Sequence, residues 1–274
     1  MSRRTTDRRY SAPALEKGLD ILELLSGEEN GLSQTEIARA LTRSVSEIFR
    51  MLVVLEERGY VAIDPDSDRY GLTTWLFEIA HRTPSVKRLT ALAGPMMRGL
   101  ARDTHQSVHL TVLSEDAVLV VGQVDPDANN ILSVRLGARI ELWRASSGRV
   151  ILAFLREEDL AEILDRYPLP AGVTEDTMRA DLSQIRQQGY EITDSFVVRG
   201  VVNIALPIID HTGQAVAALT MPHLERYHDD LTIHDCLHHV QAAARNLSRA
   251  LGGGTAETDP DRVYRRAESS EGKP

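Results

Sequence analysis

The apolar positions of the chain first form a pattern near the N-terminus. From Pro13 to Leu25, apolar side chains recur at helical spacing, and Pro13 stands in the first turn, where proline is well tolerated. The sequence therefore predicts a first helix over residues 13–25. The apolar residues that carry this pattern are Leu15, Leu19, Ile21, Leu22 and Leu25.

Two capping boxes follow, separated by a short polar turn. In such a box, a serine side chain and a glutamate three residues later satisfy the free backbone N–H groups at the start of a helix. The first box runs from Ser33 to Glu36 and the second from Ser44 to Glu47, with Thr42 and Arg43 just before the second. The pattern predicts two short helices joined by a tight turn, which is a helix-turn-helix.

A hairpin pattern completes this first region. After Gly59, a residue typical of helix ends, residues 60–63 and 69–72 favour strands and flank the turn-forming run 64–68. Helix, turn, helix and hairpin in this order predict a winged helix-turn-helix domain over residues 13–74.

The remainder of the chain alternates between strand-like and helical segments. A helical linker with a break at Pro84 is expected over 75–104, and a mixed domain over 105–251, which makes the fold class α+β. The basic arm 1–12 and the tail 252–274 lack apolar periodicity and are expected to be disordered. The expected strands are 107–113, 117–124, 131–135, 201–209 and 214–221, and the expected helices are 148–155, 157–165, 176–188 and 232–251.

Composition narrows the class of protein. No apolar run approaches the roughly 20 residues that a membrane helix needs, and no apolar core follows the charged N-terminus, so a soluble, cytoplasmic protein without a membrane partner is expected. The single cysteine, Cys236, excludes an internal disulfide framework. No cofactor is predicted.

The charge of the chain argues against nonspecific coating of nucleic acid. The formal net charge is −9, and residues 1–72 hold 10 basic against 13 acidic side chains. Nonspecific affinity depends on many Lys and Arg contacts with phosphate. Sequence-specific binding through a local patch remains possible, because four arginines cluster within residues 3–9.

Several segments of this chain resemble the IclR family of bacterial transcription regulators. They are residues 31–38 and 52–60 in the first domain, and residues 142–155, 185–190 and 200–208 in the second. The resemblance extends from about Pro13 to Gly252. It implies a GAF-like effector domain, with an antiparallel sheet flanked by helices, and homodimers that pair into dimers of dimers on DNA. The resemblance also implies repression as the expected mode of regulation.

The second helix of a helix-turn-helix places its N-terminal residues against base edges in the major groove of double-stranded DNA. Arg50 is the strongest candidate, because a guanidinium can pair bidentately with guanine or bind phosphate. A symmetric dimer would require an inverted-repeat operator. The candidate contacts in this helix and the preceding turn are Arg43, Ser44, Ser46, Glu47, Phe49 and Arg50.

Other residues in this region leave two interpretations open. Glu47 could accept a hydrogen bond from cytosine, but its capping role is favoured. Val45 and Phe49 could contact thymine methyl groups or simply pack. In the acidic wing turn, Arg69 is the only plausible phosphate contact.

The resemblance also implies a set of effector-binding positions. The helix that begins near Ser147 directs free N–H groups toward this pocket, which favours a carboxylate, and Arg144 could add a charge-assisted pair. Small organic, sugar and aromatic acids are all plausible effectors. Asn203 and Thr220 could equally be satisfied core residues. Together with Arg144, the implied positions are Ala145, Ser146, Ser147, Asp194, Val201, Asn203 and Thr220.

A metal-dependent enzyme or metal sensor is the alternative class. His234 and His238 stand four residues apart, a spacing that places both on one helical face and is compatible with zinc. Two ligands do not form a site, and no HExxH glutamate is present, so exposed helix histidines are the favoured interpretation and no metal site is predicted.

Overall fold

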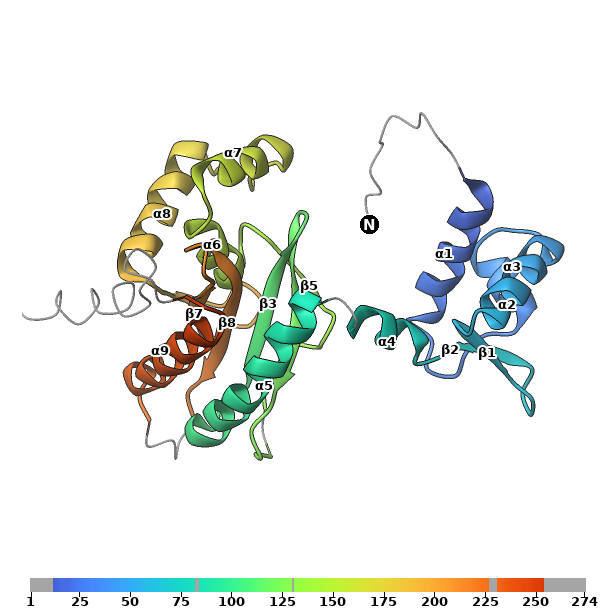
Figure 1. The fold of residues 1–274 in the computed structure, drawn as a ribbon, viewed down its shortest axis with the longest axis horizontal. Helices are drawn as coiled ribbons and strands as arrows, with labels where there is room; N and C mark the ends of the chain where they lie inside the picture. Colours follow the sequence, from blue (N-terminus) through green and yellow to red (C-terminus); the bar gives the residue numbers. More distant parts are fainter. Residues whose placement is uncertain (1–11, 82–83, 130, 227–230, 254–274) are drawn as a thin grey trace, which may run out of the picture. The chain divides into compact units, whose positions relative to one another are not determined.

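The computed structural model describes residues 12–81, 84–129, 131–226 and 231–253. The chain divides into two compact units, Met1–Pro84 and Ser85–Pro274 (Figure 1). No helix among the described residues is long and apolar enough to cross a membrane. The expected arm and most of the expected tail lie outside the described residues.

The N-terminal unit is a winged helix-turn-helix. Its core holds Ile21 and Leu25 of the first helix, Ile37 of the second, and Ile48 and Leu52 of the third. Leu15 and Leu19, which share the helical pattern of the first helix, are instead exposed. The elements are α1 (Pro13–Leu25), α2 (Gln34–Ala40), α3 (Val45–Glu57), β1 (Val61–Asp64), β2 (Arg69–Leu72) and α4 (Trp75–His81).

Both predicted capping boxes are confirmed. The Ser33 side chain accepts from the Glu36 N–H at the start of α2, and the Ser44 side chain accepts from the Glu47 N–H at the start of α3. In each box the glutamate also accepts from the backbone N–H of its serine. These bonds satisfy N–H groups that a helix leaves unpaired in its first turn. They fix where each helix begins.

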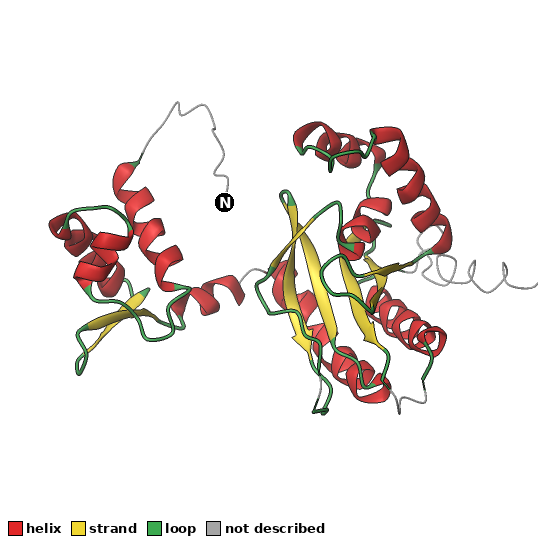
Figure 2. Cartoon of the chain, turned by 180° about the vertical axis from the view of Figure 1, so that it is seen from behind, coloured by secondary structure: helices red, strands yellow, loops and turns green. Residues whose placement is uncertain are grey.

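The C-terminal unit is built on a six-stranded antiparallel sheet in the order β5-β4-β3-β8-β7-β6. Helices cover both faces of this sheet (Figure 2), as expected for a GAF-like domain. The elements are α5 (Pro84–Thr104), β3 (Val108–Ser114), β4 (Ala117–Val124), β5 (Arg139–Glu141), α6 (Ser146–Ala153), α7 (Glu157–Arg166), α8 (Glu175–Gln188), β6 (Glu191–Asp194), β7 (Val201–Ile209), β8 (Ala215–Leu224) and α9 (Ile233–Ala250).

The two faces of the sheet carry different side chains. Large apolar residues of the strands, such as Leu110 and Leu206, pack against α5 and α9. Small residues, Ala205 and Ala218, lie on the face that receives α6, where their size lets the helix approach closely. Polar His109 alternates with Leu110 along β3 and therefore lies on the α6 face.

The structure adds three points to the sequence-based expectations for this unit. The predicted strand 131–135 is wrong: these residues are irregular, and the segment that pairs with β4 is 137–141, with Gly137 N–H donating to the Val120 carbonyl. The edge strand β6 was not predicted. Residues 75–104, expected as a helical linker with a break at Pro84, contain α4 and α5, and Leu89, Ala93 and Met97 of α5 are buried in the C-terminal core.

Candidate effector pocket and DNA-recognition helix

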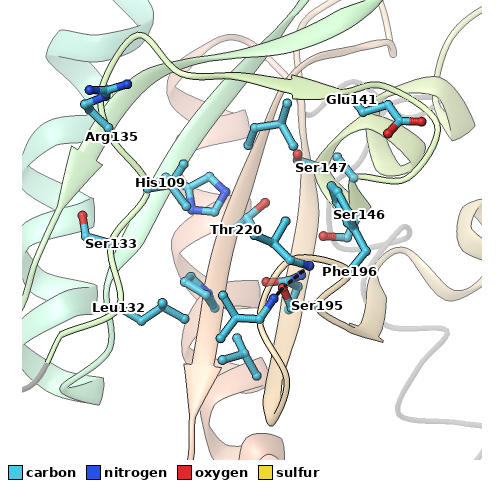
Figure 3. A pocket seen from close by; sticks show the side chains of 18 of the residues that line it. His109, Leu132, Ser133, Arg135, Glu141, Ser146, Ser147, Ser195, Phe196 and Thr220 are labelled. Atoms are coloured by element: carbon cyan, nitrogen blue, oxygen red, sulfur yellow. Dashed lines mark hydrogen bonds between the residues drawn. The ribbon is translucent and has the colours of Figure 1, made fainter.

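A pocket of about 440 Å³ opens on the α6 face of the sheet (Figure 3). Its walls come from the strands, the start of α6 and two loops, 131–138 and 195–200. Small-molecule sites are typically concave and apolar, with a few polar groups that orient the ligand. The apolar lining consists of Leu132, Val134, Ile140, Phe196, Val197, Val198, Val201 and Pro222.

The N-terminus of α6 opens into this pocket without a side-chain cap. The preceding residue is Ala145, which has no hydrogen-bonding side chain, and the first helical bond joins Arg149 N–H to the Ala145 carbonyl at 3.0 Å. The N–H groups of Ser146 and Ser147 therefore precede the helical ladder, although both residues are buried. Free N–H groups and the helix dipole favour an anion at this end of the pocket.

His109 and Thr220 form a second polar group in the pocket, on the sheet (Figure 3). They are partners across β3 and β8, so their side chains stand side by side. The Thr220 hydroxyl oxygen is buried and has no hydrogen-bond partner among the described residues. Burial lowers the pKa of His109 to about 4, which keeps the ring neutral at pH 7.

The pocket also has arginines at its edge. Arg139 is held by the Asp116 carboxylate at 2.9 Å and by Ser114. Arg135, on the loop 131–138, forms no ion pair with any residue that the structure describes. Of these two guanidinium groups, that of Arg135 is therefore the one available to a bound anion.

A mostly buried ion pair supports the turn that leads into α6. The Arg149 guanidinium binds the Glu191 carboxylate at 2.8 Å, and both side chains are less than one-fifth exposed. The same guanidinium donates to the carbonyl oxygens of Trp143 and Arg144 at 3.1 and 3.0 Å. Burial raises the pKa of Glu191, while Arg149 opposes that rise. The pair joins α6, β6 and the turn at 143–145.

The structure brings six of the eight expected effector positions together in one pocket. Asp194 does not line it, and Arg144 lies beside it, with its guanidinium carbon 4.8 Å from the centre of the Phe196 ring. Sequence reasoning missed His109 and Arg135. The sequence did carry a signal for His109: polar His109 and Thr111 alternate with apolar residues along β3. The six are Ala145, Ser146, Ser147, Val201, Asn203 and Thr220.

In the N-terminal unit, α3 exposes the face expected to read DNA. Ser46, Phe49 and Arg50 are exposed, as is Val45, while Ile48 is fully buried on the opposite face. Ser44 caps the helix. The exposed face therefore combines two polar side chains with two apolar ones.

Three expected DNA contacts are engaged within the protein. Glu47 binds Lys17 of α1 at 2.5 Å in addition to its capping bonds. Arg43 lies 3.8 Å from Asp20. Arg69 donates to the Gly31 carbonyl at 3.1 Å and pairs with Glu36 at 2.9 Å.

The alternative metal site has no support in the described part of the chain. The His234 and His238 rings meet edge to face with their centres 4.6 Å apart. No group of three or more His, Cys, Asp or Glu residues that could hold a metal ion occurs among the described residues.

A winged helix-turn-helix joined to a domain with a small-molecule pocket defines a class: DNA-binding transcriptional regulators that respond to an effector. Family comparison gives the particular assignment. Residues 14–65 match the IclR helix-turn-helix domain, and residues 81–249 match the bacterial transcriptional regulator IclR C-terminal domain. The chain belongs to the IclR family and is a transcriptional regulator, not an enzyme.

Individual relatives agree with this assignment. The transcriptional regulator KdgR of Dickeya chrysanthemi is 30% identical over 248 residues, which cover 88% of this chain and 81% of KdgR. The Thermotoga maritima IclR structure is 26% identical with a TM-score of 0.68, covering 87% of this chain and 98% of its own. An IclR homolog from Microbacterium hydrocarbonoxydans, complexed with 4-hydroxybenzoate, has a TM-score of 0.73 at 23% identity, over 87% and 98% of the two chains.

Proposed function

We propose that this regulator is a cytoplasmic repressor whose operator binding is controlled by a small carboxylic acid in the α6 pocket. The main support for this proposal is the uncapped N-terminus of α6, which presents buried N–H groups to an apolar pocket. A carboxylate there would accept hydrogen bonds from Ser146 and Ser147 and gain from the helix dipole. Arg135 at the pocket edge would add an opposite charge.

The pocket also indicates the body of the acid. Its lining is largely apolar, and the polar groups on its central strands β3 and β8, His109 and Thr220, are uncharged at neutral pH. An acid with an apolar body suits such a site better than a polyanion, because burying a second charge without a partner is unfavourable. The homolog complexed with 4-hydroxybenzoate is a precedent for an aromatic acid in this fold.

On the DNA side, α3 would enter the major groove with Ser46, Phe49 and Arg50 facing the bases. A homodimer, or a dimer of dimers, would present two such helices to an inverted repeat. The acid would favour one arrangement of the DNA-binding heads over another, so its binding and operator binding would be coupled reciprocally. Repression is proposed from the family resemblance.

Anisotropy with the full-length protein tests this function. Labelled DNA from the intergenic region upstream of its own gene is titrated with and without a panel of short-chain, sugar and aromatic acids. We expect saturable binding that resists competitor DNA and changes with one class of acid. Absence of specific binding, both there and at sites selected from the whole genome, would refute the regulator's proposed operator binding.

A matched pair of variants tests the pocket. Arg135→Gln should weaken the response to the acid, because it removes the guanidinium at the pocket edge that has no ion-pair partner among the described residues. Arg102→Gln changes an arginine of α5 that is 76% exposed, pairs with Asp103 and does not line the pocket. The control should respond like the wild type. Equal responses from both variants would remove Arg135 from the site.

A further inference from the structure

We infer that α3 recognises thymine methyl groups in the major groove through the side chains of Val45 and Phe49. The inference rests on the proposed binding of operator DNA by α3 and specifies the chemistry of the half-site. Its basis is an exposed apolar pair in the first half of α3, on a face that also carries exposed Ser46 and Arg50.

The exposure of the pair excludes an ordinary core role. Val45 is 46% exposed and Phe49 is 50% exposed. The two residues stand four apart, so they lie together on one side of the helix. Ile48 and Leu52 hold α3 in the core with no exposed surface. Folding of this domain therefore does not require apolar residues at positions 45 and 49.

The acidic residue of the same helix turn, Glu47, is bound by groups within the protein. The Glu47 carboxylate accepts from the Ser44 N–H at 3.1 Å and the Ser44 hydroxyl at 2.7 Å, and it binds Lys17 at 2.5 Å. These bonds, that from Lys17 foremost, lower the pKa of Glu47 to about 2. An anion fixed in this way is not available to accept from a cytosine amino group.

The other exposed groups on this face of α3 are compatible with binding to DNA. Arg50 forms no hydrogen bond or ion pair with any residue in the described ranges, and Ser46 is exposed beside it. A guanidinium next to the apolar pair matches phosphate or guanine next to a methyl group. In the major groove, the thymine C5-methyl is the apolar group that base edges present. Two apolar side chains beside a free cation are a small surface for a stable protein partner.

The inference predicts a feature of the operator. Each half-site should contain thymine where Val45 and Phe49 meet the groove, close to the base or phosphate bound by Arg50. The methyl group, rather than a hydrogen-bonding atom, should carry the preference. Selection of high-affinity sequences from a random DNA pool with the full-length protein would supply the half-site for the test.

Uracil substitution tests the methyl contact directly. Each thymine of the selected half-site is replaced by deoxyuridine in turn, which removes the methyl group and leaves base pairing unchanged. We expect at least one replacement per half-site to weaken binding of the wild-type protein about fourfold, the effect of exposing one apolar methyl group. If every uracil-containing site binds as tightly as its thymine parent, the inference is wrong.

Variants of α3 identify the side chains responsible. Phe49→Ala and Val45→Ala should lose the preference for thymine over uracil at one position each, while keeping the preference at other bases. Val54→Ala is the matched control, because Val54 lies on the same helix and is 47% exposed, but belongs to its C-terminal half. Preferences unchanged in both test variants would also overturn the inference. If the protein binds no DNA specifically, the proposed operator binding fails, and this inference with it.

Discussion

Gly148 in α6 lies so close to the carbonyl oxygen of Leu142 that a Cβ atom at position 148 would stand 2.1 Å from it. Only glycine fits this approach without moving the backbone, because real Cβ contacts do not come so near. The close approach lets the chain turn sharply between β5 and α6. It thereby places the uncapped helix end at the pocket.

Gly148→Ala should therefore destabilise the C-terminal unit by about 2–3 kcal/mol, the cost of overpacking a site that cannot relax easily. Chemical denaturation measures the change. Gly99→Ala in α5 is the control, since a Cβ there meets only the end of the Arg102 side chain at 3.9 Å. That control should gain up to about 1 kcal/mol from helix propensity. A Gly148→Ala protein as stable as the wild type would contradict the rigid turn.

Removal of Arg149 should be costly because its partner would remain mostly buried. Arg149→Met should reduce the free energy of unfolding by about 2–4 kcal/mol, and adding Glu191→Gln should recover part of this loss. Arg139→Met is the comparison: that arginine pairs with Asp116 on the surface, and its loss should cost at most about 1 kcal/mol. Similar losses in the two single variants would show that the burial of the Arg149 pair has no energetic consequence.

His109 should make stability depend on pH. The pKa of His109 is lowered by burial to about 4, so the folded protein binds this proton less readily than the unfolded chain does. Neutral His109 therefore contributes up to about 3 kcal/mol to the free energy of unfolding. This contribution is fully present above the usual histidine pKa of about 6.5 and is lost as the pH falls toward 4. His109→Leu should remove this part of the decline. Denaturant unfolding of both proteins between pH 4 and 7.5 gives the difference, and parallel profiles would refute the prediction.

Thr220→Val should separate stability from ligand binding. The wild-type hydroxyl is buried without a partner among the described residues, so replacing it with a methyl group should raise the free energy of unfolding by about 1 kcal/mol. The same change should weaken binding of any acid whose hydroxyl or carbonyl group contacts Thr220. Calorimetry with the acid found in the anisotropy panel measures the second effect. A destabilised variant would mean that the hydroxyl has a partner in the folded protein.

The N-terminal fold was accessible from sequence because its signals are local. A capping box identifies a helix start within four residues, and the boxes at Ser33 and Ser44 are both present in the structure. The wing was equally clear, since its two strands are neighbours in the chain. In the C-terminal unit, strands β7 and β8 were predicted from the composition of 201–209 and 214–221, and the structure joins them by a turn in which Gly213 N–H donates to the Asp210 carbonyl.

The pocket was less accessible, since residues distant in sequence form it. The run 131–135 has strand-like composition, but the register of β4 and β5 places it opposite residues near 123–127, where β4 ends at Val124 and the chain continues to Pro126. The pairing of His109 with Thr220 depends on the register of β3 and β8, which no local pattern specifies. Family resemblance gave the positions on α6 and β7, whereas Arg135 came only from the structure.

In α3, the residues that maintain the helix differ from the residues that face outward, and this separation has an evolutionary consequence. Capping by Ser44 and burial of Ile48 and Leu52 maintain the helix, while the outward side chains at 45, 46, 49 and 50 contribute little to folding. Mutations at these four positions can therefore accumulate without loss of the domain. A lineage of such proteins could acquire new target genes by drift on one face of α3, with its chemical sensor left intact.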